Sequence, residues 1–78
     1  MTDDEMIATI LRMVAQVEKD EASRRVFSTG QQIAIAFVLN RKDWLDEMAY
    51  SEMLAAIERL GPQWFRAAQQ AWLIRKSA

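Results

Sequence analysis

Seven consecutive apolar residues, at positions 33–39, constrain the fold more than any other feature of this sequence. They follow a polar stretch, residues 28–32, and stop at Asn40, a residue type that can adopt the left-handed conformation that ends helices. In a helix, side chains about 100° apart would point these apolar groups in every direction, which is typical of a helix surrounded by protein. We therefore expect this segment to lie at the centre of the fold.

The same run also fits a buried strand, because periodicity does not separate the two for a short apolar segment. Its alternating large and small side chains and its β-branched residues favour a strand. The flanking residues favour a helix, since Ser28 with Gln31, and Thr29 with Gln32, have the spacing of a capping box. The alanines are strong helix formers, and no other segment offers a convincing partner strand. We predict a helix over residues 30–39.

The N-terminal part of the chain predicts an amphipathic helix of four to five turns. Thr2 and Glu5 form a second capping-box pattern, and the acidic residues of the first turn suit the positive end of a helix dipole. This helix is expected to end between Lys19 and Ser23, with residues 21–27 as a connection or a frayed continuation of the helix. Apolar residues recur at helical spacing along one face: Met6, Ile7, Ile10, Leu11, Met13, Val14 and Val17.

Two further helical segments follow the central helix. Asp43 is expected to cap one short helical turn, with Trp44, Leu45 and Met48 facing the core. Ser51 is then expected to cap a longer helix. Its inner face is expected to hold Met53, Leu54, Ile57 and Leu60.

Gly61 and Pro62 predict a sharp joint before the last helix. Glycine relieves the strain of a left-handed residue at a helix end, and proline is pre-set for the first position of the next helix. The last helix is expected over residues 62–76. Together these segments predict an all-α fold: a compact single-domain bundle, residues 1–78, of four helices plus one short helical turn.

Composition argues against catalysis, metal binding and a bound cofactor. The chain has no cysteine and no histidine, which removes the commonest metal ligand and the commonest general base. Asp43, Asp46 and Glu47 could share one helical face and bind a divalent cation weakly. Acid enrichment at a helix start explains them without a ligand. We therefore expect no catalytic, cofactor-binding or metal-binding residues.

The large side chains predict a protein-binding surface. Three tryptophans, five methionines and three phenylalanines are many for 78 residues, and tryptophan is enriched in binding hot spots. On the last helix, Phe65, Ala68 and Trp72 form one face, and the apolar residues beside that face are too many for a small core. We predict binding of a protein partner, or of a second copy of the chain, through Trp64, Ala67, Ala71, Ile74 and Leu73.

The alternative function is association with nucleic acid. It would use Arg24, Arg25, Arg41 and Lys42, which flank the two ends of the central helix and could converge in space. A net charge of −1 gives no general attraction to nucleic acid, so this function is the less favoured. The acidic N-terminus differs from a signal peptide and no apolar run has the length of a membrane span, so we expect a cytoplasmic protein without membrane contact.

Overall fold

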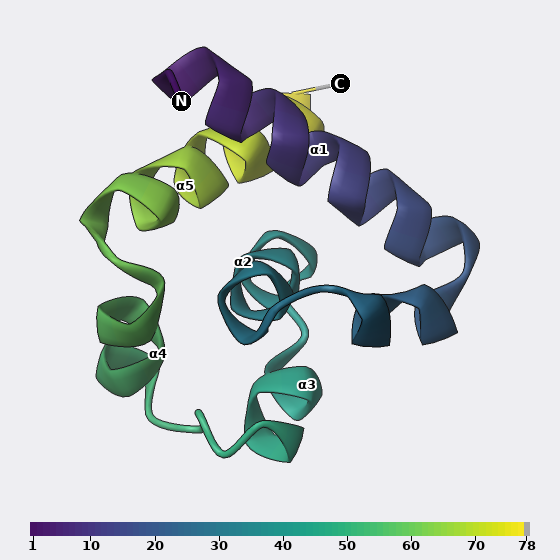
Figure 1. Ribbon diagram of the computed structural model, residues 1–78, viewed down its shortest axis with the longest axis vertical. Coiled ribbons are helices and arrows are strands. Elements are labelled where there is room, and N and C mark those ends of the chain that lie inside the picture. The colour runs from purple at the N-terminus through teal and green to yellow at the C-terminus, as the bar shows by residue number, and fades with distance from the viewer. Residues whose placement is uncertain (78) are drawn as a thin grey trace.

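Helix α2 (Thr29–Leu39) occupies the centre of the molecule, and the other helices surround it (Figure 1). The computed structural model describes residues 1–77, and within these residues all regular secondary structure is helical. The other elements are α1 (Asp3–Lys19), the short 3₁₀ helix η1 (Glu21–Val26), α3 (Lys42–Glu47), α4 (Met53–Leu60) and α5 (Pro62–Ser77). The predicted all-α class is confirmed.

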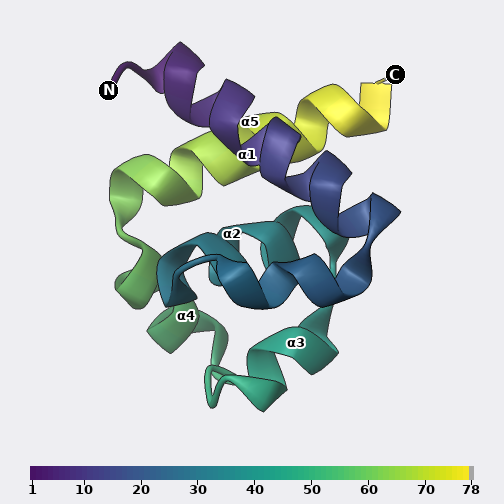
Figure 2. The ribbon, with the colours of Figure 1, turned by 45° about the vertical axis from the view of Figure 1, so that its right-hand side comes forward.

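The helices form three layers when the molecule is turned (Figure 2). Helices α1 and α5 cross each other on one side of α2, and α3 and α4 lie on the other side. Helix α5 packs against both α1 and α2, so it joins the outer layer to the centre. This arrangement leaves α2 in contact with α1, α3, α4 and α5.

Side-chain caps fix the starts of α1 and α2. The Thr2 hydroxyl accepts from the Glu5 N–H (3.2 Å), and the Glu5 carboxylate accepts from the Thr2 N–H (3.2 Å). Ser28 and Gln31 make the same reciprocal pair at 3.2 and 2.9 Å, so of the two possible capping boxes this one forms. Asn40 ends α2 at φ 55°, as the sequence predicts.

The largest fully buried side chains of the core lie on α1 and α2. Ile10, Val14 and Val17 of α1 are at most 1% exposed, as are Ile33 and Ile35 of α2. Helix α2 buries residues on nearly all of its sides, which confirms the interpretation of the apolar run. Its single large aromatic, Phe37, is only partly buried.

Residues 21–26 form a 3₁₀ helix rather than a plain connection. The Asp20 carboxylate accepts from the Ala22 N–H (3.2 Å), which satisfies a free amide at the start of this helix. Arg24 is buried here, 7% exposed. This mainly polar segment has no apolar period that predicts a helix.

The expected cap of the next segment is wrong, although its buried face is confirmed. Helix α3 starts one residue before Asp43, whose carboxylate instead accepts from the Arg41 guanidinium (3.0 and 2.8 Å). Trp44 and Leu45 are buried as expected, and Met48 packs partly against the core.

Helix α4 differs more from the expectation. Its N-cap position is Glu52 and not Ser51, and no side chain caps it. Met53 and Leu54 are 51% and 81% exposed, so the prediction that they face the core is wrong. Ala56 is the buried residue of this turn, and Leu54, two positions earlier, lies about 200° away around the helix.

The joint between α4 and α5 agrees with the sequence. Gly61 lies at φ 89° and ψ 155°, a region that essentially only glycine occupies. Pro62 is the first residue of α5. The chain therefore turns sharply here, and α5 runs back over α2.

Candidate functional site

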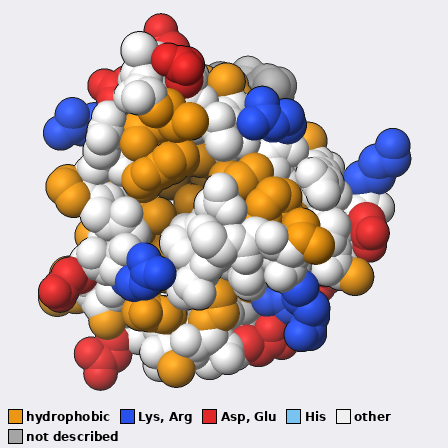
Figure 3. All heavy atoms as spheres, viewed as in Figure 1, with side chains coloured by type: hydrophobic (Ala, Val, Ile, Leu, Met, Phe, Trp, Pro, Cys, Tyr) orange, Lys and Arg blue, Asp and Glu red, His pale blue; other side chains and the backbone are white. Residues whose placement is uncertain are grey.

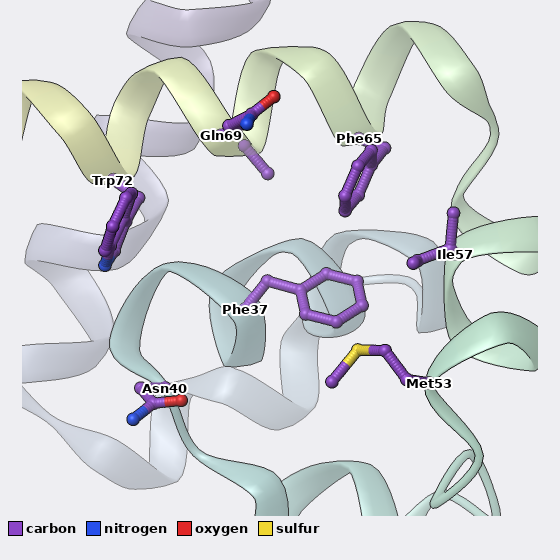
Figure 4. Close-up of a pocket in the computed structure, with 8 residues that line it drawn as sticks. Phe37, Asn40, Met53, Ile57, Phe65, Gln69 and Trp72 are labelled. Atoms are coloured by element: carbon purple, nitrogen blue, oxygen red, sulfur yellow. The ribbon is translucent and has the colours of Figure 1, made fainter.

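An apolar cavity of about 430 Å³ lies between α2, α4 and α5. We call it the groove. In Figure 4 the apolar side chains of Phe37, Phe65, Met53 and Ile57 point toward one another from the three helices. The residues that line it are Phe37, Asn40, Met53, Ile57, Phe65, Ala68, Gln69 and Trp72.

Two phenylalanines and a tryptophan form the main apolar surfaces of the groove. The ring of Phe37 meets that of Phe65 edge to face, with centroids 5.9 Å apart and an interplanar angle of 80°. Trp72, two turns further along α5, is 40% exposed. Large aromatic surfaces are therefore held in place and still reach solvent.

The rim of the groove is uncharged. Met53 and Ile57 of α4 line it opposite α5, and Asn40 and Gln69 contribute amide groups (Figure 4). Among the residues described, no acidic or basic side chain lines this cavity. Such a surface can hold apolar groups and a few hydrogen-bonding groups, but it presents no general base or nucleophile.

A second, shallower depression adjoins the groove and shares Trp72 as a wall. It is lined by Val38, Trp72, Arg75 and Lys76. The Lys76 ammonium lies 4.7 Å from the centroid of the Trp72 ring, within the range of a cation–π contact. One end of the groove is therefore apolar, and the other end leads to two basic residues.

The two basic residues differ in their partners. The Arg75 guanidinium donates twice to the Glu18 carboxylate at 2.7 Å, an ion pair that joins α5 to α1. These hydrogen bonds lower the pKa of Glu18 and raise that of Arg75. No carboxylate of residues 1–77 lies within 4 Å of the Lys76 ammonium.

The predicted partner-binding residues do not form one surface. Ala67 and Ala71 are 3% and 0% exposed, so they belong to the core and their assignment as contact residues is wrong. Their small side chains let α5 approach α1 and α2 closely, which turns the alanine face inward. Leu73 and Ile74 are exposed, at 41% and 49%.

The two tryptophans of α5 lie on different sides. Trp64 is half-buried and lines a separate depression of about 250 Å³ near the start of α2. Trp72, which the sequence places on the same face as Phe65 and Ala68, stays at the surface. The sequence thus identifies the helix that carries the exposed aromatic residue Trp72, and the assignment of Trp64 as a partner contact stays a prediction.

Two of the four candidate nucleic-acid residues do converge. The guanidinium carbons of Arg24 and Arg41 lie 4.6 and 4.2 Å from the ring centroid of Trp44. Arg24 donates to Glu47 at 2.8 Å. Arg41 pairs with Asp43, and the hydrogen bonds from Arg41 lower the pKa of Asp43. Glu21 also lies 3.5 Å from the Arg41 guanidinium, so the cluster holds three carboxylates and two guanidinium groups.

The other two candidates do not add a basic surface. Lys42 pairs with Asp46 at 3.3 Å, and Arg25 is exposed without a carboxylate within 4 Å among residues 1–77. On the face drawn in Figure 3, acidic and basic side chains alternate around the edge. The part of that face covered by the described residues has no extended patch of one charge.

The acidic trio of α3 is likewise occupied by ion pairs. Asp43, Asp46 and Glu47 each lie within 4 Å of an arginine or lysine nitrogen. In the part of the chain that the structure describes, no set of three metal-ligating side chains gathers. Only Asp43 lies in the first turn of α3, and the ion pairs give all three acids a partner within the protein.

No protein-family model, curated protein or solved structure matches this chain at a significant level. In residues 1–77, none of the helices combines the length and the apolar character needed to cross a membrane. The geometry of the groove is therefore the main basis for a functional assignment.

Proposed function

We propose that this protein is a small non-catalytic interaction module that binds a protein partner in the groove. The observation that supports this most is the exposure of Trp72 and Met53, 40% and 51%, within a 430 Å³ apolar cavity. A small soluble domain gains stability by burying such side chains. Their exposure in a concave site is typical of a surface that a partner covers.

The residue types fit recognition of a protein. Tryptophan is enriched in binding hot spots, and methionine adapts its shape to varied apolar partners. The aromatic rings of Phe37 and Phe65 stabilise each other, so the base of the groove is preorganised. A partner would not need to order these rings on binding.

Nucleic-acid association has less support. The guanidinium groups of Arg24 and Arg41 are engaged by Glu47 and Asp43, and Arg24 is buried. Contacts to phosphates would have to displace these carboxylates. Nucleic-acid association therefore stays the alternative, and the experiment must distinguish it from binding of a protein partner.

Two neighbouring residues of α4 provide a matched test. Met53→Glu places a carboxylate in the groove, whereas Leu54→Glu places the same charge on the next residue, which is 81% exposed and outside the groove. Both lie in the first turn of α4, where an acid suits the helix dipole, so both variants should fold. Circular dichroism would verify this.

The measurement is capture of proteins from a lysate of the source organism on the immobilised wild type and variants, with and without nuclease. We expect proteins retained by the wild type and Leu54→Glu to be lost with Met53→Glu, and to be unaffected by nuclease. Retention that needs nucleic acid and falls steeply with salt would overturn the proposal in favour of the alternative. Equal retention by both variants would show that the groove is not the binding surface.

A further inference from the structure

The length of the groove matches two turns of a helix. Phe65, Ala68 and Trp72 line it at positions i, i+3 and i+7 of α5, which span about 10 Å along the helix axis. The apolar anchors of an amphipathic helix, at i, i+3 or i+4, and i+7, cover the same length. A helix lying along α5 could therefore place three anchors in the groove.

The groove offers little to the backbone of a ligand. Seven of its eight lining residues lie within α2, α4 and α5, where backbone groups are hydrogen-bonded along the helix, and Asn40 and Gln69 are its only polar residues among those described. An extended peptide would leave most of its N–H and C=O groups without partners against this apolar surface. A helical ligand satisfies its own backbone groups and presents only side chains.

Charge distinguishes the two ends of the groove. Lys76 is one helical turn beyond Trp72, its ammonium lies over the Trp72 ring, and no carboxylate of residues 1–77 is within 4 Å. Arg75 beside it is already paired with Glu18. At the other end of the groove, Met53 and Ile57 are apolar. An anionic group on the ligand would therefore be favoured only at the Lys76 end.

We infer that the occupant of the groove is an amphipathic helix of a partner protein, with three apolar anchors over two turns and a carboxylate about one turn beyond them. The anchors lie against Phe37, Phe65 and Trp72, and the carboxylate pairs with the Lys76 ammonium. This inference rests on the proposed function, because it specifies the partner that the groove accepts.

An unbiased selection tests it. A displayed library of 16-residue peptides, random in sequence, would be selected on the intact wild-type protein and in parallel on Lys76→Glu. Arg66→Glu is the matched control, since it makes the same charge change on an exposed residue of α5 outside the groove. Helical content measured by circular dichroism would confirm that the three proteins share one fold.

We expect the wild type and Arg66→Glu to select apolar residues at helical spacing followed by Asp or Glu one turn away. Lys76→Glu should select Lys or Arg at that position instead. In synthetic versions, changing the acid to its amide should weaken binding to the wild type by about threefold, as for an exposed ion pair. Binding should also be lost with Met53→Glu and kept with Leu54→Glu.

The outcomes separate this inference from the proposed function. Peptides that depend on Met53 but show no charge preference at the Lys76 end, or that have no helical spacing, would overturn the inference and leave the proposed function standing. If every selected peptide bound Met53→Glu as well as the wild type, the groove would not be a binding surface, and both would be overturned.

Discussion

Two sides of the molecule contain similar apolar residues but use them differently. One side is built from α1 and α2, and on the other side α4 and α5 frame the groove. Ile10, Val14 and Ile33 are completely buried, and both α1 and α2 begin with a capping box. Helix α4 has no side-chain cap, and it leaves Met53 and Leu54 at the surface. The first side has the features that stabilise a fold, whereas the second keeps apolar area available.

The difference follows from packing and not from composition. A long helix between two neighbours buries a wide arc, and α1 and α2 both meet α5 as well as each other, whereas α4 also meets two helices, α2 and α5, but is short. Helix α4 has eight residues and buries chiefly Ala56 and Leu60, four positions apart. Apolar residues outside that narrow arc have no partner within the domain. For this reason the same residue type stabilises one side and stays exposed on the other, where we propose a binding surface.

The largest expected effect comes from truncating the core. Ile35→Ala removes a completely buried side chain and should lower the free energy of unfolding by about 2–5 kcal/mol. Met53→Ala, on the groove side, should cost less than about 1 kcal/mol because half of the side chain is already in water. Denaturant unfolding of both variants measures this difference, and equal losses of unfolding free energy would contradict it.

The joint between α4 and α5 should give the next largest effect. Gly61→Ala forces a side chain into a backbone region that essentially only glycine occupies, at a cost of about 1–3 kcal/mol. The added methyl group meets no atom within 4 Å, so the cost would be backbone strain alone. A variant as stable as the wild type would show that the joint relaxes freely and that α4 does not hold a fixed position along the groove.

Substitution of two serines compares the start of α2 with the start of α4. Ser28→Ala removes the cap of α2 and should lower the free energy of unfolding by about 1 kcal/mol. Ser51→Ala should change it by less than about 0.5 kcal/mol, because Ser51 is exposed and caps no helix. Thermal or denaturant unfolding measures both. A larger loss at Ser51 would indicate that α4 is capped in solution.

The smallest effect concerns pH and the ion pair between α1 and α5. The Arg75 guanidinium lowers the pKa of Glu18, so the pair stabilises the fold above the usual glutamate pKa and this contribution is lost as the pH falls. The Arg75 and Glu18 side chains are 35% and 45% exposed, which limits the effect to less than about 1 kcal/mol. Glu18→Gln should therefore lose less stability than the wild type between pH 6 and about pH 3. The free energy of unfolding of the wild type and of Glu18→Gln would be measured across this pH range. An identical pH dependence for the two proteins would contradict the prediction.

Much of the fold follows from local sequence. The caps at Thr2 and Ser28, the left-handed Asn40 and the joint at Gly61 each depend on a few neighbouring residues, and each is where the sequence predicts it. The 3₁₀ helix at residues 21–26 was not predicted, because its buried Arg24 is held by Glu47 of a distant segment. Local patterns carry no information about such a contact.

The groove lies beyond local prediction for the same reason. Helical periodicity gives an apolar arc on α5 but not the angle at which that arc meets α1 and α2. The alanine side, with Ala67 and Ala71, packs inward, and this rotation leaves Trp72 outside. The one signal of the groove in the sequence is Phe37, since it is the only large aromatic residue in the apolar run.

Methionine methyl groups provide the most direct test of the division between the two sides. Met6 and Met13 are 4% exposed in the core, whereas Met53 lies on the rim of the groove. We would record their ¹³C–¹H signals while adding a helical peptide selected on the intact protein. The account predicts that the Met53 signal shifts with binding and that those of Met6 and Met13 stay in place. Shifts at Met6 and Met13 with an unchanged Met53 signal would contradict it.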